Sequence, residues 1–204
     1  MSLNHLHESL TGNPDRLGWS QLLFFSPDKT SLLNSKGVLY AVVSSKNQEK
    51  EVENSVVGKS ILSEIKDAYY RNPKNTLEAL SECILFVKEK FKLQDIEIVI
   101  TVYVGGKLYF IATNGAGVKI KRNKKIVNIL KTQTGELKLA SGFPKEGDTY
   151  VIGTNKIFEL SDIYNLDDIL INEENIKNAI SEFEKKMDPV GLSGNLGLFM
   201  VNFA

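Results

Sequence analysis

The polar turn that follows a predicted buried strand is the first place where this sequence could hold chemistry. Residues 150–152 read Tyr-Val-Ile, and Thr154, Asn155 and Lys156 follow after one glycine. Polar side chains on the segment that leaves a core strand are a common location for catalytic and binding groups. This turn offers an amide and an ammonium group but no carboxylate. Whether it belongs to an active site therefore depends on acids elsewhere in the chain.

The histidines, the cysteine and a pair of serines do not form a recognisable catalytic or metal-binding pattern. His5 and His7 lie near the start of the chain without further ligands, so we expect a mobile terminus and no metal site. Cys83 falls on the apolar stripe of a predicted helix, where a packed thiol is expected. Ser44 and Ser45 have no histidine in a nucleophile–base arrangement, so they do not form a catalytic triad.

A group of basic residues surrounds a predicted hairpin tip. Its members are Lys119, Lys121, Arg122, Lys124 and Lys125. We expect a solvated tip, and contact with an anion or with nucleic acid is the alternative. Few aromatic residues lie among these side chains, so stacking of bases has little support. The glycine-rich loop at 114–117 leads into a strand and lacks the Lys-Ser/Thr of a phosphate-binding loop, so we expect a plain turn there.

Length and composition are those of one globular domain. The 204 residues include 25 Lys plus Arg and 25 Asp plus Glu, so no net charge draws the chain toward nucleic acid or an anionic membrane. The single cysteine rules out an internal disulfide and fits a reducing compartment. We see no signal peptide and no stretch of about 18 apolar residues, so we expect a cytoplasmic protein without a membrane segment. Because the sequence ends directly after an apolar strand, we hypothesise that residues 1–204 are one domain cut from a longer protein.

Hydrophobic periodicity predicts two strands, two helices, five strands, one or two helices and a final strand. The expected strands are 21–26, 37–44, 96–104, 108–113, 118–121, 126–130, 149–152 and 196–203. The clearest helix has an apolar stripe formed by Leu77, Leu80, Ile84, Val87 and Phe91. We expect the first four of these residues to face a sheet.

Asn75, followed by Glu78, is the start signal of this clearest helix. Other helices are expected around 52–69 and 161–164, and after Asn172 as a cap. Together these elements indicate an α+β fold in which two antiparallel β-sheets pack as a sandwich flanked by helices.

Four segments of the chain occur in an order and spacing that resemble one enzyme family. They are 39–48 (LYAVVSSKNQ), 107–122 (KLYFIATNGAGVKIKR), 147–156 (GDTYVIGTNK) and 194–195 (Gly-Asn). They are similar to the Asp-Gly-x-Gly-Gly strand, the Gly-Asp-Ser hairpin, the Thr-Asp-Gly strand end and the final Asp-Asn of the PPM-type metal-dependent serine/threonine phosphatases. The resemblance implies the protein phosphatase 2C-like fold along nearly the whole chain.

The same resemblance implies that the metal-binding acids are missing. In that family, carboxylates at strand ends bridge two divalent cations, and a water held between the cations attacks phosphate. The matching positions carry Ser44, Ser45, Ala116, Asn155, Lys156, Gly194 and Asn195, with no carboxylate among them. Asp148 is too far away to substitute, because seven strand residues separate it from Asn155, about 23 Å.

The resemblance therefore implies a pseudophosphatase without cofactor that binds a protein partner in a regulatory role. A divergent manganese- or magnesium-dependent phosphatase with shifted ligands is the alternative, with Glu49, Glu51 and Asp28 as the nearest candidates. A nucleic-acid-binding module that uses the basic hairpin is the weaker alternative. The sequence does not identify the partner.

Overall fold

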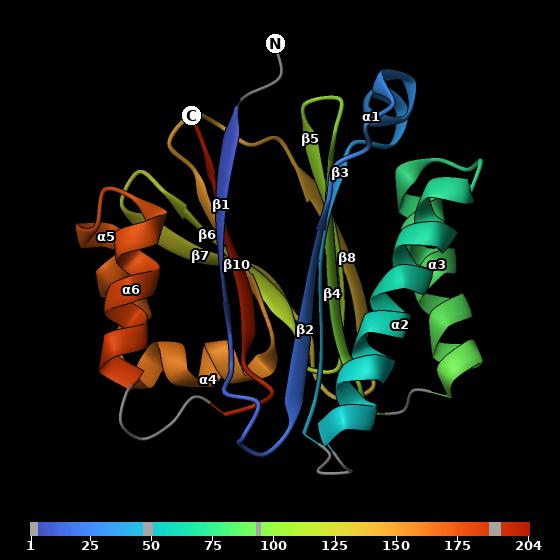
Figure 1. Ribbon diagram of the computed structural model, residues 1–204. Helices are drawn as coiled ribbons and strands as arrows, with labels where there is room; N and C mark the ends of the chain where they lie inside the picture. Colours follow the sequence, from blue (N-terminus) through green and yellow to red (C-terminus); the bar gives the residue numbers. More distant parts are fainter. Residues whose placement is uncertain (1–3, 47–50, 93–94, 188–192) are drawn as a thin grey trace.

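A computed structural model describes residues 4–46, 51–92, 95–187 and 193–204, and for 51–55 the backbone only. The chain forms two five-stranded antiparallel sheets that pack face to face with helices outside both (Figure 1). The α+β sandwich predicted from the sequence is therefore confirmed. Within the described residues, none of the helices combines the length and the apolar character needed to cross a membrane.

Each of the two sheets takes strands from both the N-terminal and the C-terminal half of the chain. Sheet A has the strand order β1 (His5–Thr11), β10 (Gly197–Phe203), β9 (Thr149–Gly153), β6 (Gly117–Arg122) and β7 (Lys125–Lys131). Sheet B has the order β2 (Trp19–Phe25), β3 (Val38–Ser45), β4 (Glu97–Val104), β5 (Lys107–Thr113) and β8 (Leu137–Gly142). The edge strands are thus β1 and β7 in sheet A, and β2 and β8 in sheet B.

The helices form two outer layers and one short connection. Sheet B is covered by α2 (Glu51–Arg71) and α3 (Thr76–Phe91), and sheet A by α4 (Asn155–Ile163), α5 (Leu166–Asn172) and α6 (Ile176–Met187) (Figure 1). The short α1 (Thr30–Lys36) lies at the end of the sandwich where the chain begins (Figure 1).

Three apolar clusters hold these layers together. In β3, Tyr40 and Val42 belong to the cluster between the two sheets, whereas Leu39, Ala41 and Val43 belong to the cluster under α2 and α3. This alternation follows from the two-residue period of a strand, and it explains why β3 is apolar on both faces. A third cluster joins sheet A to α4, α5 and α6.

The helix that the sequence marked most clearly is present with its expected start. The side chain of Asn75 accepts a hydrogen bond of 3.1 Å from the backbone N–H of Glu78. Leu80, Ile84 and Val87 are buried against sheet B as predicted. The prediction for Leu77 was wrong: this residue is 38% exposed and does not belong to the apolar cluster between α3 and sheet B.

Several boundaries differ from the sequence prediction. Strands β1 and β8 and helix α1 were not expected, and the short helix expected at 161–164 is part of the longer α4. Asn172 ends α5 and does not cap the next helix; Asn175 does so, accepting a 2.8 Å bond from the N–H of Asn178.

The prediction of a mobile terminus at His5 and His7 was also wrong. Both residues lie in β1, which pairs along its whole length with β10. The His5 ring packs against Tyr40, Tyr103 and Phe203 at centroid distances of 6.1, 5.6 and 5.7 Å. Each histidine therefore serves as a packing group of the inter-sheet core.

Candidate functional site

Asn155 stands where strands from both sheets and the first turn of a helix meet. It follows β9 and begins α4, at the end of the sandwich opposite α1 (Figure 1). Its backbone N–H donates a hydrogen bond of 2.7 Å to Oε2 of Glu97, the first residue of β4 in the other sheet. Ser44, near the end of β3, is the register partner of Glu97. The sequence-predicted positions 44 and 155 are therefore brought together.

Glu97 is a buried carboxylate that the sequence analysis missed. Its residue is 4% exposed, and Oε2 also accepts a hydrogen bond of 3.3 Å from the Ser44 hydroxyl. Burial raises the pKa of the Glu97 carboxyl, and the Asn155 N–H, Lys46, Ser44 and Lys131 oppose that shift. The available signal was an acid at the start of an otherwise apolar strand, EIVITVYV.

Lys131 brings a positive charge to the same place from the end of β7. Its Nζ donates a hydrogen bond of 2.7 Å to Oδ1 of Asn155 and lies 4.1 Å from the centre of the Phe158 ring. Burial lowers the pKa of Lys131 to about 8, while nearby carboxylates, first that of Glu97, oppose the shift. A half-buried ammonium group thus lies beside the residue that matches the Thr-Asp-Gly acid.

Asn155 forms hydrogen bonds within the protein through its backbone N–H and through both polar atoms of its side chain. Besides the bonds to Glu97 and Lys131, its Nδ2 donates a hydrogen bond of 2.6 Å to Oε1 of Glu159 one turn later in α4. Glu159 also forms ion pairs with Lys156 at 3.3 Å and with Lys46 at 3.9 Å. We refer to Ser44, Glu97, Lys131, Asn155 and Glu159 as the Asn155 cluster.

The loop between β5 and β6 closes over this cluster. Gly115 has φ +97°, and a Cβ built on it would lie 2.9 Å from Cβ of Asn155, so only glycine permits this approach. Ala116 is fully buried and carries no polar side chain, while its carbonyl accepts a 2.8 Å bond from the Thr132 hydroxyl. The position that matches the Gly-Asp-Ser acid is thus a packing position.

Gly194 and Asn195, which match the final Asp-Asn, have a structural role outside the Asn155 cluster. The N–H of Gly194 donates a 3.0 Å bond to the carbonyl of Leu17, and an added Cβ would lie 2.1 Å from the carbonyl oxygen of Gly18. Asn195 is buried and its Oδ1 accepts a hydrogen bond from the Ser193 hydroxyl. These contacts join the segment before β10 to the loop before β2.

The donor atoms of the Asn155 cluster do not fit a pair of divalent cations. Its two carboxylates are Glu97, which is engaged by protein donors, and Glu159, which is paired with lysines. Across the part of the chain that the structure describes, no group of three or more His, Cys, Asp or Glu could hold a metal ion. The ammonium group of Lys131 also lies beside Asn155, and its positive charge would repel a cation bound there.

The candidates for shifted ligands have different outcomes. Asp28 lies beyond the end of β2, where Phe25 pairs with Leu39, and five strand residues separate Leu39 from Ser44, about 17 Å. Asp28 is therefore at the opposite end of the sheet. Glu49 and the side chain of Glu51 lie outside the described residues.

The structure separates the basic residues that the sequence placed at one hairpin tip. Lys119 is buried and bonds to Ser161 at 2.8 Å and to Asp167 at 2.9 Å. Lys121 donates a 2.6 Å bond to the carbonyl of Leu170. These two side chains therefore hold β6 to the helices that cover sheet A.

Arg122 is also engaged inside the molecule. Its guanidinium binds both carboxylate oxygens of Asp148, with distances of 2.8 and 2.6 Å, and Asp148 is 1% exposed. The two-residue turn that follows contains Asn123 and Lys124, and Lys125 begins β7 at an exposed position. Lys124 and Lys125 are therefore the members of the set that lie at the tip.

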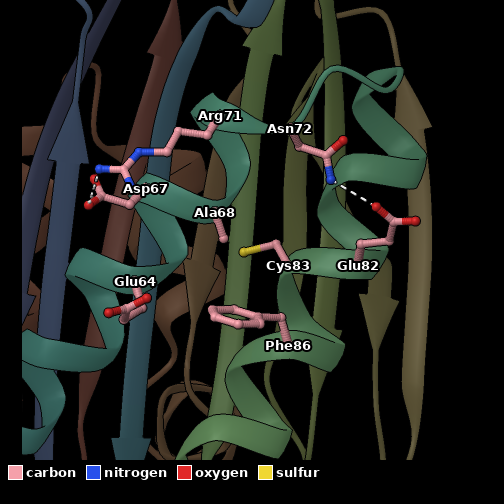
Figure 2. Close-up of a pocket in the computed structure, with 8 residues that line it drawn as sticks. All are labelled: Glu64, Asp67, Ala68, Arg71, Asn72, Glu82, Cys83 and Phe86. Atoms are coloured by element: carbon pink, nitrogen blue, oxygen red, sulfur yellow. Dashed lines mark hydrogen bonds and ion pairs between the residues drawn. The ribbon is translucent and has the colours of Figure 1, made fainter.

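A separate groove of about 390 Å³ lies between α2 and α3 (Figure 2). Its acidic side chains, Glu64, Asp67 and Glu82, all form ion pairs with neighbouring lysine or arginine residues. Cys83 lies at its base, and burial raises the pKa of this thiol to about 12. The expectation that Cys83 is a packed thiol is therefore confirmed. The groove is remote from Asn155.

No protein-family model matches the sequence, and no curated protein matches it. Solved structures match along the whole chain. The serine/threonine phosphatase of S. agalactiae has a TM-score of 0.72 at 9% identity, with 99% of this chain and 100% of that chain covered.

Two further solved structures have TM-scores of 0.66. PppA, a key regulatory component of T6SS in Pseudomonas aeruginosa, is 12% identical, with 100% of this chain and 99% of that chain covered. The catalytic domain of the phosphatase PstP, in complex with two manganese ions, is 10% identical, with 99% and 98% covered. At such identities the comparisons show the fold alone, and that fold is the one of the PPM-type, protein phosphatase 2C-like serine/threonine phosphatases.

Proposed function

We propose that this chain is a catalytically inactive phosphatase-like domain that acts in the cytoplasm by binding a protein partner. The observation that carries the proposal is the hydrogen bond between Nζ of Lys131 and Oδ1 of Asn155. At the position of the Thr-Asp-Gly acid, the chain has a neutral amide that is held by an internal cation.

The chemistry of phosphatases with this fold explains why it matters that an amide stands in place of a carboxylate. A phosphatase of this type activates water between two divalent cations, and anionic oxygen ligands hold those cations. In the Asn155 cluster, Glu97 accepts hydrogen bonds from Ser44 and from the N–H of Asn155. The ammonium group of Lys131 can only donate hydrogen bonds, so it cannot coordinate and polarise a water as a metal ion does. The described residues of the Asn155 cluster therefore form a packed polar network of hydrogen bonds and ion pairs.

The regulatory part of the proposal has support from the structural relatives. PppA is described as a regulatory component, and another match with a TM-score of 0.69 at 12% identity comprises the RsbU and RsbW domains of one Mycobacterium tuberculosis protein. These identities do not transfer a partner to this chain.

A phosphatase assay tests the proposal. We expect no hydrolysis of p-nitrophenyl phosphate or phosphopeptides above a buffer control with manganese or magnesium. Asn155→Asp alone should not create activity, because one added carboxylate cannot hold two cations. Metal-dependent hydrolysis that is lost in Glu49→Ala would overturn the proposal in favour of an enzyme with shifted ligands.

The nucleic-acid alternative has less support from the structure than from the sequence. The side chains of Lys119, Lys121 and Arg122 are committed to contacts inside the molecule. The two lysines at the tip offer few phosphate contacts, so any binding should be weak and should fade steeply with salt. A dissociation constant below about 1 μM for DNA or RNA near physiological salt would support this alternative, provided that the binding is lost in Lys124→Ala/Lys125→Ala.

A further inference from the structure

Strand β7 (Lys125–Lys131) is an edge strand of sheet A. Among the described strands it pairs with β6 alone, at the side of the sheet that is remote from β1 (Figure 1). An edge strand presents a row of N–H and C=O groups with which another extended chain can pair. A segment of a second protein can use such a row to add one more strand to a sheet. We call the side of β7 that faces away from β6 the β7 edge.

The register of the β6–β7 hairpin determines which backbone groups face the β7 edge. The two-residue turn 123–124 has positive φ at both positions, as in a type I′ turn. The flanking pair of Arg122 and Lys125 is therefore a hydrogen-bonded pair, and bonded and non-bonded pairs alternate from there along the strands. It follows that Ile126 and Asn128 direct their N–H and C=O groups toward the β7 edge. Among the described residues, no hydrogen bond from another strand or loop reaches the backbone of either one.

The middle of β7 is open to solvent. Val127 is 57% exposed, and Asn128 is exposed as well. Strand β8 of the other sheet touches β7 near its C-terminal end, where Nζ of Lys138 donates a 3.0 Å bond to the carbonyl of Lys131. Val127 pairs with Ile120, a member of the core between the sheets, so its side chain lies on the inner face of sheet A. An apolar side chain of an added strand would therefore cover Val127.

The charge of the hairpin favours an acidic segment. From Lys119 to Gly135 the sequence contains no Asp or Glu. Lys124 and Lys125 are exposed at the tip, where β7 begins. Opposite charges on neighbouring strands stabilise their pairing, and like charges directly opposite destabilise it. An added strand with acidic side chains at this end would therefore be favoured over a basic one.

The same lysines disfavour a second copy of this chain as the occupant. An antiparallel pairing of β7 with its own copy, centred on Asn128, would set Lys125 directly opposite Lys131. Like charges in directly opposite positions destabilise such a pair. Charged residues of this kind are a common means by which proteins prevent edge-to-edge association of identical strands.

We propose that the β7 edge docks an extended, acidic segment of a partner protein, which adds a strand to sheet A. The backbone groups of Ile126 and Asn128 provide the hydrogen bonds, and Val127 provides an apolar contact. The exposed lysines of the tip favour acidic side chains. This inference rests on the proposed function only in that the partner is a protein, and it is independent of whether the Asn155 cluster supports catalysis.

Titration of the isotope-labelled full chain with peptides, followed by backbone amide NMR, tests the proposal. The probe is the acetylated and amidated peptide Asp-Glu-Val-Thr-Val-Glu-Asp. We expect it to shift the amide signals of Ile126 and Asn128 and to slow the hydrogen exchange of both amides. A peptide with Lys in place of every acid should bind at least about tenfold more weakly, because like charges repel. The acidic peptide with N-methyl groups on its three central residues should also bind at least about tenfold more weakly, because main-chain hydrogen bonds give such docking its affinity.

Several outcomes of this titration would overturn the proposal. One is equal binding of the basic or the N-methylated peptide, and another is no change at Ile126 and Asn128 with the acidic probe at a concentration on the order of 1 mM. Shifts of these two signals that grow with protein concentration alone would identify a second copy as the occupant. A stronger response to a single-stranded DNA oligonucleotide than to the acidic probe would point to nucleic acid. The phosphatase assay reports on catalysis separately, so failure here leaves the proposed loss of activity standing.

A matched pair of variants at Asn128 separates the backbone from the side chain. Asn128→Pro removes the N–H that faces the β7 edge, and proline is tolerated where the N–H of an edge strand faces solvent. It should weaken binding of the acidic probe at least about tenfold, whereas Asn128→Ala, which keeps the N–H, should bind within about twofold of the unaltered chain. If Asn128→Pro keeps a dispersed amide spectrum and binds the probe normally, the docking strand is not β7.

A charge reversal tests the same edge without a change of the backbone. Lys125→Glu should weaken binding of the acidic peptide about tenfold and strengthen binding of the basic peptide. Lys59→Glu is the matched control, because Lys59 is an exposed lysine of α2, which covers the other sheet. Equal effects of the two variants would mean that only the net charge matters, and this would overturn the proposal.

Discussion

At the scale of single residues, the Asn155 cluster shows how an internal cation and an internal anion can occupy one site. Asn155 accepts from Lys131 through its side chain and donates to Glu97 through its backbone. Burial disfavours the charged form of both titratable partners, because it raises the pKa of Glu97 and lowers that of Lys131. Their opposite charges offset part of that cost.

The lowered pKa of Lys131 predicts how stability depends on pH. Its folded pKa is about 8 and the ordinary value is 10.5, so between these values the unfolded chain binds more protons. The contribution of Lys131 to the free energy of unfolding therefore rises with pH across this window. The stability of Lys131→Met relative to the unaltered protein should fall between pH 8 and 10.5.

Urea denaturation at several pH values measures this difference for Lys131→Met. Lys125→Met is the matched control, because Lys125 is an exposed lysine at the other end of the same strand, β7. A stability difference for Lys131→Met that does not change with pH would mean that its ammonium group is not desolvated as described.

A second prediction at this scale concerns two fully buried tyrosines. The hydroxyl of Tyr40 has no partner among the described residues, whereas that of Tyr69 donates a 2.9 Å bond to the carbonyl of Lys36. Tyr40→Phe should leave the free energy of unfolding unchanged or raise it by up to about 1 kcal/mol. Tyr69→Phe should lower it by about 0.5–1.5 kcal/mol, because it removes a formed bond. Chemical denaturation that shows a larger loss for Tyr40→Phe would reveal a missing partner.

At the scale of elements, α3 is held to sheet B by one narrow stripe. Leu80 is fully buried there, whereas Leu77, three residues earlier, is 38% exposed. Leu80→Ala should lower the free energy of unfolding by about 2–5 kcal/mol, which is the usual range for a buried leucine. Leu77→Ala should cost clearly less, because Leu77 stays partly exposed to water in the folded protein and its truncation leaves no enclosed cavity. Similar losses for the two variants, measured by denaturant unfolding, would contradict the assignment of the stripe.

At the scale of the whole molecule, we predict that divalent cations do not stabilise the fold. A ligand that binds only the native state at 100 times its dissociation constant adds about 2.7 kcal/mol. For a chain of this size, that would raise the melting temperature by roughly 5–10 °C. Since the described site lacks the required acids, millimolar manganese, magnesium or chelator should change the melting temperature by no more than about 1 °C. A rise of several degrees with manganese, reversed by chelator, would show that the metal ligands lie elsewhere in the chain.

The sequence by itself determined the class of fold and the identity of most elements. The apolar, β-branched runs of β4 and β5, and the 3–4 spacing of α3 with its Asn75 cap, follow from local rules that need no knowledge of the partner element. The resemblance seen in the sequence also implies that the matching positions carry no carboxylate. It did not reveal β1, because a short polar-apolar strand such as HLHESLT gains its stability from pairing with β10.

Only the tertiary structure decided which charged side chains meet. Lys131 and Asn155 are 24 positions apart, and Glu97 and Asn155 are 58 apart, so no local spacing could indicate either contact. Likewise, Lys119 and Arg122 belonged to one basic run in the sequence but pair with different acids, Asp167 and Asp148. The physical reason is that burial and ion pairing depend on which strands become neighbours, and sheet pairing joins residues without regard to their separation along the chain.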